Sequence, residues 1–168
     1  CVDSNPDTEP LGKQELASGD ALNAALTRRG SGLKDGWNFL HVRAKNGAGV
    51  WSAAAHTQFM LDNTPPRVVR TEPPPGGSST GQTLRFFLDE DHGVDVLGLR
   101  VSVNGQVAPG RQGLTYDAAT NCLTYNALAA GNPWAEGKVS VDVYGLKDLL
   151  GNQAAAPYSF NFNAERST

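Results

Sequence analysis

The stretch DGWNFLHVRAKNGAGVWS, residues 35–52, alternates apolar and polar side chains before it breaks into a glycine-rich turn. In an extended chain, Leu40, Val42 and Ala44 fall on one face and the residues between them fall on the other. This period of two predicts a β-strand whose buried face carries these three side chains.

A turn and a second strand follow the first. Asn46, Gly47 and Gly49 tolerate positive φ, which favours a tight hairpin turn, and the run HTQFML at 56–61 is again β-like. Two nearby glycines also suit a phosphate-binding loop, but that loop needs a following helix and a third glycine or a lysine. A β-like run follows instead, so we expect a hairpin with Trp51 packed back on the sheet.

The composition suits two small β domains. The 168 residues are 39 % hydrophobic and 18 % charged, with 19 Gly and 10 Pro, which indicates many short elements separated by turns. The proline-rich stretch at 67–82 marks an edge strand or a stiff linker, because proline removes ladder donors. We place the domain boundary at about residue 65, which gives domains 1–65 and 66–168.

Beyond this boundary, turn signals separate a series of β-like segments, as in an antiparallel sandwich. The segments are TLRFFL (83–88), GLRVSVNG (98–105), GLTYDAATNCLTY (113–125), GKVSVDVYGLKD (137–148) and APYSFNFN (156–163). Three sets of side chains share a parity and are candidate core residues: Leu99, Val101 and Val103; Val139, Val141 and Val143; Tyr158, Phe160 and Phe162. Only 15–29 has helical character. The predicted fold class is all-β, with two tandem antiparallel β-sandwiches.

The charge and the cysteine content limit the classes of partner and of covalent cross-link that we expect. The formal net charge of −3 and the pI of about 5.5 argue against nucleic acid and anionic membranes, and no apolar run approaches the roughly 20 residues of a membrane span. Cys1 and Cys122 form no CxxC pair, so we expect two unpaired thiols. Cys1 followed by a polar stretch is also compatible with a lipid-anchored cysteine.

Residues 1–66 resemble the later part of a bacterial fibronectin type III-like domain. The pieces that carry the resemblance stand in the family's order: VDSNPDTEP (2–10), LKDG (33–36), WNFLHVRA (37–44), NGAGVWS (46–52) and LDNTPP (61–66). The match begins at the family's third strand, so the first two strands are absent. Either the chain is a fragment, or a neighbouring chain supplies strands by β-strand addition, or residues 11–30 follow an unusual path.

Residues 67–163 resemble the bacterial Ig-like domains that occur in tandem in surface and secreted proteins. The matching pieces are PRVV (66–69), DEDHGVD (89–95), VSVNG (101–105), YDAATNCLTY (116–125) and KDLLGN (147–152). Together the two resemblances imply tandem β-sandwich domains in an extracellular or cell-surface protein.

The acidic loop DEDHGVD is the leading candidate for a ligand site. Asp89, Asp91 and Asp95 offer carboxylate oxygens, which hard cations require, and predict a calcium loop. Asp62 and Asn63 near the domain junction are further oxygen donors. Positions five and twelve of the run hold glycine and arginine, so the loop is no EF-hand, and a solvated loop without a ligand stays an alternative.

No catalytic motif stands out, because the chain has neither a Gly-x-Ser-x-Gly elbow nor a His-Glu-x-x-His spacing. We therefore expect no enzymatic activity. His41 and His56 face each other across the predicted hairpin, where a weak metal pair is one reading and surface bystanders the commoner one.

Exposed aromatic rings are the feature that a sugar-binding surface needs, since flat rings stack on pyranose faces. Of the three tryptophans, Trp37 and Trp51 fall at motif positions that predict packed rings, and Trp134 is the third. Phe39 is the better candidate for an outward ring.

These observations favour a non-enzymatic structural or adhesive module of a bacterial extracellular or cell-surface protein, acting as a rigid spacer and a protein-interaction scaffold. Its partners are other domains of a longer chain or neighbouring subunits, and calcium is the one cofactor considered. Two alternatives stay open. One is a carbohydrate-binding accessory module of a secreted enzyme, with polysaccharide as the partner. The other is a self-assembling filament or shell subunit completed by strands from a neighbouring chain.

Overall fold

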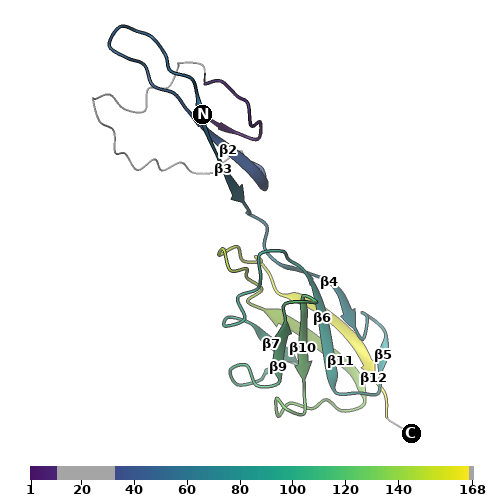
Figure 1. Cartoon of the computed structure of the whole chain (residues 1–168). Coiled ribbons are helices and arrows are strands. Elements are labelled where there is room, and N and C mark those ends of the chain that lie inside the picture. The colour runs from purple at the N-terminus through teal and green to yellow at the C-terminus, as the bar shows by residue number, and fades with distance from the viewer. Residues whose placement is uncertain (11–32, 167–168) are drawn as a thin grey trace. The chain divides into compact units, whose positions relative to one another are not determined.

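The computed structural model describes residues 1–10 and 33–166. The chain divides into two compact units, Cys1–Asn63 and Thr64–Thr168, compared with the predicted boundary at about residue 65. The helical character predicted for 15–29 lies outside the described residues. Each unit is built from β-strands (Figure 1), which confirms the all-β fold class.

The described part of the first unit holds one antiparallel sheet in the order β1-β2-β3. Its strands are β1 (Val2–Asp3), β2 (Gly36–Val42) and β3 (Ala55–Leu61). Strands β2 and β3 form the predicted hairpin, with Gly36 opposite Leu61 at one end and Val42 opposite Ala55 at the other.

Asn46 holds the tip of the turn between β2 and β3 through its side chain and its backbone. Asn46 Oδ1 accepts the N–H groups of Ala48 at 3.0 Å and Val50 at 2.9 Å, and the Asn46 C=O accepts the N–H of Gly49 at 2.9 Å. Gly49 has a φ of +82°, which an L side chain rarely adopts. The turn uses these backbone donors itself, so the glycines shape a hairpin, as predicted.

The predicted buried face of β2 is wrong in part. Leu40 is half-buried, but Val42 is 40 % exposed and Ala44 is exposed, whereas His41 on the opposite parity is buried. Residues 1–10 and 33–63 contain no second sheet to cover the Leu40 side. An alternating pattern identifies a strand, but burial also requires a covering layer.

The second unit is a two-layer sandwich, shown in the lower part of Figure 1. One sheet has the order β4-β6-β10-β9 and the other β5-β12-β11-β7-β8. The first sheet consists of β4 (Arg67–Glu72), β6 (Thr83–Asp89), β10 (Cys122–Asn126) and β9 (Leu114–Asp117). The second consists of β5 (Ser78–Ser79), β12 (Tyr158–Ala164), β11 (Gly137–Tyr144), β7 (Arg100–Val103) and β8 (Gln106–Val107).

This strand order is that of an immunoglobulin-like sandwich. If β4, β6, β7, β9, β10, β11 and β12 are lettered A to G, the sheets read A-B-E-D and C-F-G. All pairings are antiparallel except that of β5 with β12, which is parallel. The proline-flanked β4 lies at a sheet edge, as predicted for the 67–82 stretch.

The core of the second unit lies between its two sheets. The three predicted parity sets face inward, and eight of their nine members are buried while Tyr158 is half-buried. Phe86 of β6 meets Phe160 of β12 edge to face at 6.1 Å between ring centroids. Of the two cysteines, both free, Cys122 is buried and Cys1 is exposed.

Two glycines give a matched test of how tightly the β9–β10 corner is packed. Gly113 (φ +74°) has Ala130 atoms 2.8 and 2.9 Å from where a Cβ would lie, whereas Gly131 (φ +70°) has no atom within 4 Å. Gly131→Ala should lower the free energy of unfolding by about 1–2 kcal/mol, because its only cost is an alanine held at positive φ. Gly113→Ala adds steric overlap and should lower the free energy of unfolding by a further 1–3 kcal/mol or so. Urea denaturation measures both, and equal losses would contradict the packing described.

Candidate functional site

The three carboxylates of the predicted calcium loop have three different partners. Asp89 accepts a hydrogen bond from Arg67 Nε at 2.8 Å, and Asp95 Oδ2 lies 3.5 Å from Lys147 Nζ. Asp91 Oδ1 lies 2.8 Å from Nδ1 of His92. The structure therefore does not gather the three carboxylates around one point, and calcium binding stays a prediction.

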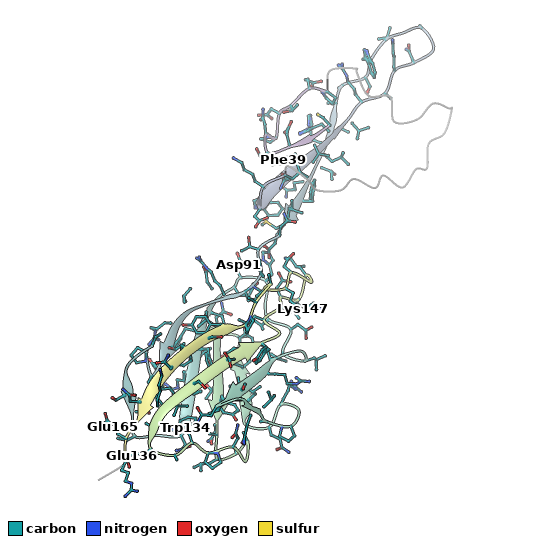
Figure 2. The ribbon with its side chains drawn as sticks, turned by 180° about the vertical axis from the view of Figure 1, so that it is seen from behind. Phe39, Asp91, Trp134, Glu136, Lys147 and Glu165 are labelled. Atoms are coloured by element: carbon teal, nitrogen blue, oxygen red, sulfur yellow. The ribbon has the colours of Figure 1, made fainter. Side chains whose placement is uncertain are left out.

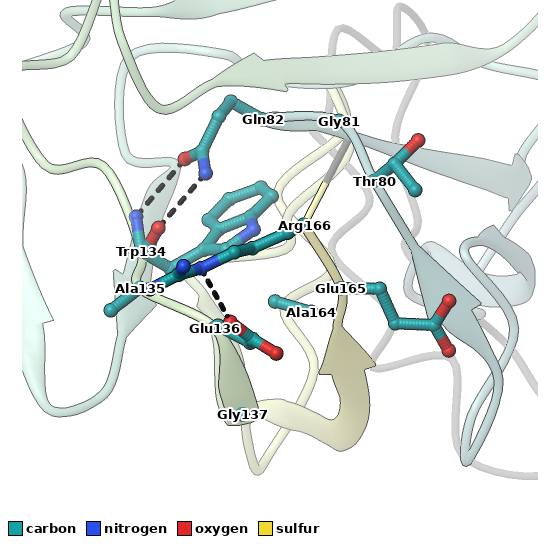
Figure 3. Close-up of a pocket in the computed structure, with 10 residues that line it drawn as sticks. All are labelled: Thr80, Gly81, Gln82, Trp134, Ala135, Glu136, Gly137, Ala164, Glu165 and Arg166. Carbon is teal, nitrogen blue, oxygen red and sulfur yellow. Dashed lines mark hydrogen bonds and ion pairs between the residues drawn. The ribbon is translucent and has the colours of Figure 1, made fainter. Parts of the chain in front are cut away.

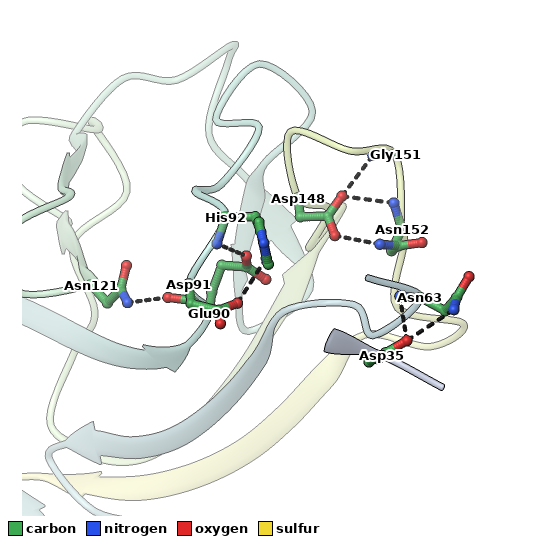
Figure 4. Close-up of polar contacts among 9 residues, drawn as sticks. All are labelled: Asp35, Asn63, Glu90, Asp91, His92, Asn121, Asp148, Gly151 and Asn152. Atoms are coloured by element: carbon green, nitrogen blue, oxygen red, sulfur yellow. Dashed lines mark hydrogen bonds and ion pairs between the residues drawn. The ribbon is translucent and has the colours of Figure 1, made fainter. Parts of the chain in front are cut away.

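A different set of side chains does converge at this loop. Ligand atoms of Glu90, Asp91 and His92 all lie within 4.8 Å of one another, and Figure 4 shows the three together. Glu90 is buried and accepts the N–H of His92 at 2.6 Å. A mixed carboxylate and imidazole set suits transition metals more than Ca²⁺.

Sequence reasoning missed Glu90 and His92 because it counted only the aspartates of the run. The signal that identifies them is their adjacency in a tight turn, which brings neighbouring side chains together irrespective of strand parity. The two extra donors proposed, Asp62 and Asn63, both belong to the first unit. Asn63 binds Asp35 Oδ1 through its backbone and side-chain N–H groups, each at 2.9 Å.

A buried carboxylate fixes the neighbouring loop. Asp148 has no exposed surface and accepts the N–H groups of Gly151 at 2.6 Å and Asn152 at 2.8 Å, together with Asn152 Nδ2 at 2.6 Å. Asp148 also forms a backbone bridge with Val94. The KDLLGN motif thus has a structural role, since it anchors the end of the acidic loop.

The hydrogen bonds at Asp148 also set its ionisation. Burial raises the pKa of the carboxyl, but hydrogen bonds from the Asn152 side chain and from backbone N–H groups outweigh burial, and the pKa lies below its ordinary value of 3.8.

The opposite end of the second unit carries an open hollow. Figure 2 shows Trp134, Glu136 and Glu165 at that end and Asp91 and Lys147 at the other. The hollow has a volume of about 670 Å³.

The hollow is lined by a tryptophan that is fixed through its backbone (Figure 3). Gln82 Nε2 donates to the Trp134 C=O at 2.9 Å, and the Trp134 N–H donates to Gln82 Oε1 at 3.0 Å. The indole is 6 % exposed and meets Phe162 edge to face. A covered ring of this kind offers no face for sugar stacking.

The predictions for the other aromatic rings are wrong. Trp37 is 54 % exposed and Trp51 is 40 % exposed, whereas Phe39 is half-buried. The Trp51 ring lies against two cations, with Arg43 Cζ 4.5 Å and Lys45 Nζ 5.5 Å from its centroid. Both tryptophans lie in the first unit, whose described sheet has no second layer to bury them.

The predicted meeting of His41 and His56 is confirmed. The two residues are cross-strand partners, and their Nδ1 atoms lie 2.7 Å apart.

Comparisons with known proteins give distant structural similarity. No family model and no curated protein matches the chain. A structure of CopC from Methylosinus trichosporium OB3b is similar, with a TM-score of 0.46 and 14 % identity over 61 % of this chain and 96 % of that one. The titin domains Z1Z2 in complex with telethonin give a TM-score of 0.37 and 16 % identity over 80 % of this chain and 62 % of that one.

Within residues 1–10 and 33–166, no helix is long and apolar enough to cross a membrane.

The lowered pKa of Asp148 predicts a pH-dependent contribution to stability. We expect Asp148→Asn to lower the free energy of unfolding by about 1–3 kcal/mol at pH 7, because the amide cannot accept all the hydrogen bonds of the carboxylate. The stability that the Asp148 carboxylate contributes is complete above the pKa that this carboxyl has in the unfolded chain. It is lost as the pH falls through the lower pKa of the same group in the folded protein. Denaturation at pH 7 and pH 3 measures this. Asp91→Asn, a change at an exposed carboxylate, is the control. If Asp148→Asn lowered the free energy of unfolding by the same amount at pH 3 as at pH 7, the assignment would be contradicted.

Proposed function

We propose that the chain is a non-enzymatic structural module of a bacterial extracellular or cell-surface assembly. In this proposal the Ig-like second unit is a rigid spacer, and the first unit joins chains through the outer edge of β3. The observation that carries the proposal is the contrast between β3 and the sheet edges of the second unit.

The edge strands of the second unit are protected in the usual ways. Strand β4 carries Arg67 and Arg70, while β5 and β8 have two residues each and β9 has four. Charge and shortness both discourage pairing with another chain.

Strand β3 lacks these protections. It is seven residues long, five of them exposed, and its sequence AHTQFML contains no charged residue and no proline. In the order β1-β2-β3, no described strand pairs with its outer side. Met60, 46 % exposed, lies opposite the exposed Trp37. An extended, uncharged edge with large apolar side chains suits β-strand addition.

The hydrogen-bond pattern of β2 defines which backbone groups of β3 face outward. The N–H of His41 binds the C=O of Cys1 at 3.0 Å, and the amino group of Cys1 binds the C=O of His41 at 2.9 Å. The backbone of His41 therefore faces β1. Because backbone groups alternate along a strand, Leu40 faces β3, where its partner is Thr57.

The backbone of Thr57 accordingly faces β2, and the alternate residues His56, Gln58 and Met60 direct their N–H and C=O groups to the outer edge. A second copy of β3 is the partner that this edge fits. An antiparallel pair about a two-fold axis at Gln58 places glutamine opposite glutamine and His56 opposite Met60. No like charges meet in that arrangement.

Sedimentation velocity over a range of concentrations tests this function. We expect the wild-type chain to self-associate and Gln58→Pro to stay monomeric, because proline removes an outward N–H that the hairpin itself does not use. Gln58→Ala, which keeps the N–H, is the matched control and should associate like the wild type. A wild-type chain that is monomeric throughout, or a proline variant that still associates, would rule the proposal out.

The exposed Trp37 ring supports a second candidate, a carbohydrate-binding module. For this function, polysaccharide should quench tryptophan fluorescence in the wild type and not in Trp37→Ala. Trp134→Phe, which changes a buried ring, should leave binding intact. Absence of polysaccharide binding by the wild type counts against this candidate and leaves self-association unaffected.

A further inference from the structure

His41 and His56 bring two imidazole nitrogens to one point on the face of the β2–β3 hairpin. The residues are direct cross-strand partners, and their Nδ1 atoms are 2.7 Å apart. At this distance one nitrogen donates a proton to the lone pair of the other, since two lone pairs would repel. The two ring nitrogens are therefore already held as neighbours in space.

Asp3 of β1 orients the buried member of this pair. Its Oδ1 lies 3.2 Å from Nε2 of His41, and the His41 side chain has no exposed surface. A carboxylate at Nε2 retains the proton on that nitrogen and leaves the lone pair on Nδ1, which points to His56. The same carboxylate–imidazole arrangement orients histidine ligands in metal sites. Phe39 stacks on the His41 ring, with centroids 6.3 Å apart and planes at 24°.

We propose that His41 and His56 bind a divalent transition-metal ion through their Nδ1 atoms, with Asp3 as a positioning residue. The ion takes the place of the proton now shared between the rings. The inference does not rest on self-association of β3.

The nitrogen separation fits a particular coordination geometry. Two nitrogens bound at about 2.05 Å lie roughly 2.9 Å apart at a right angle and roughly 3.35 Å apart at a tetrahedral angle. The observed 2.7 Å is closer to the right angle, which is the arrangement of cis ligands around Cu²⁺ or Ni²⁺. His56 is exposed, so its ring can make the small adjustment, and water completes the coordination.

The donor set also excludes the cation predicted for the acidic loop. Ca²⁺ takes oxygen ligands, and the groups that converge here are imidazole nitrogens. Imidazole suits Cu²⁺, Ni²⁺ and Zn²⁺, and Cu²⁺ leads the affinity order of the divalent metals. A bound ion would join two strands across the hairpin and resist their separation.

Cu²⁺ titration of the full chain, followed by electron paramagnetic resonance and calorimetry, tests the site. The double variant Cys1→Ser, His92→Ala serves as the background, so that the exposed thiol does not reduce the ion and the group of Glu90, Asp91 and His92 does not compete for it. We expect one Cu²⁺ per chain with hyperfine coupling to two imidazole nitrogens. His56→Ala, a change at an exposed side chain, should weaken binding at least tenfold and leave one such nitrogen.

Two further variants distinguish the metal-binding histidines from a residue that only positions them and from a residue with no role in binding. Asp3→Asn should weaken binding by about 10–100-fold with both nitrogens retained, as expected for a positioning residue. Thr57→Ala changes an exposed neighbour of His56 on β3 that carries no imidazole and should bind like the background protein. Circular dichroism checks that each variant keeps its sheet. Binding that persists in His56→Ala, or that disappears in Thr57→Ala, would overturn the assignment.

Discussion

The register of the β2–β3 hairpin is the constraint on which the first unit depends. Because side chains alternate with a period of two, a slip by one residue would exchange the faces of a strand and redirect its backbone groups. The observed register places Trp37 opposite Met60 and His41 opposite His56. It also turns the N–H of Gln58 away from β2. The exposed edge and the histidine pair are thus two consequences of one alignment.

The second unit does not depend on an outside partner for its core. Its two sheets cover each other, and its longest edge strand carries arginines. The loops at its two ends are tied down by side-chain bonds to backbone, those of Asp148 at one end and of Gln82 at the other. A unit whose two sheets cover each other, and a unit whose described strands leave the outer edge of β3 unpaired, suit the proposed roles of spacer and binding element.

Much of this fold could be predicted from the sequence, because periodicity and turn chemistry are local. The parity of Val139, Val141 and Val143 identified core positions, and the turn residues after β2 identified the hairpin. Periodicity did not predict which face of β2 is buried, because burial depends on a second layer. The exposures of Trp37 and Phe39 were misjudged for that reason. The sequence pattern did not predict the grouping of Glu90 with His92, because the side chains of a tight turn converge without following strand parity.

Amide hydrogen exchange along β3 is the most direct measurement of whether its outer edge joins chains. The account predicts that the N–H groups of Thr57 and Phe59, which face β2, are protected at every protein concentration. Those of His56, Gln58 and Met60 should be fast to exchange in dilute protein and become protected as the concentration rises. Exchange of these three that is independent of concentration would contradict an edge completed by a second copy.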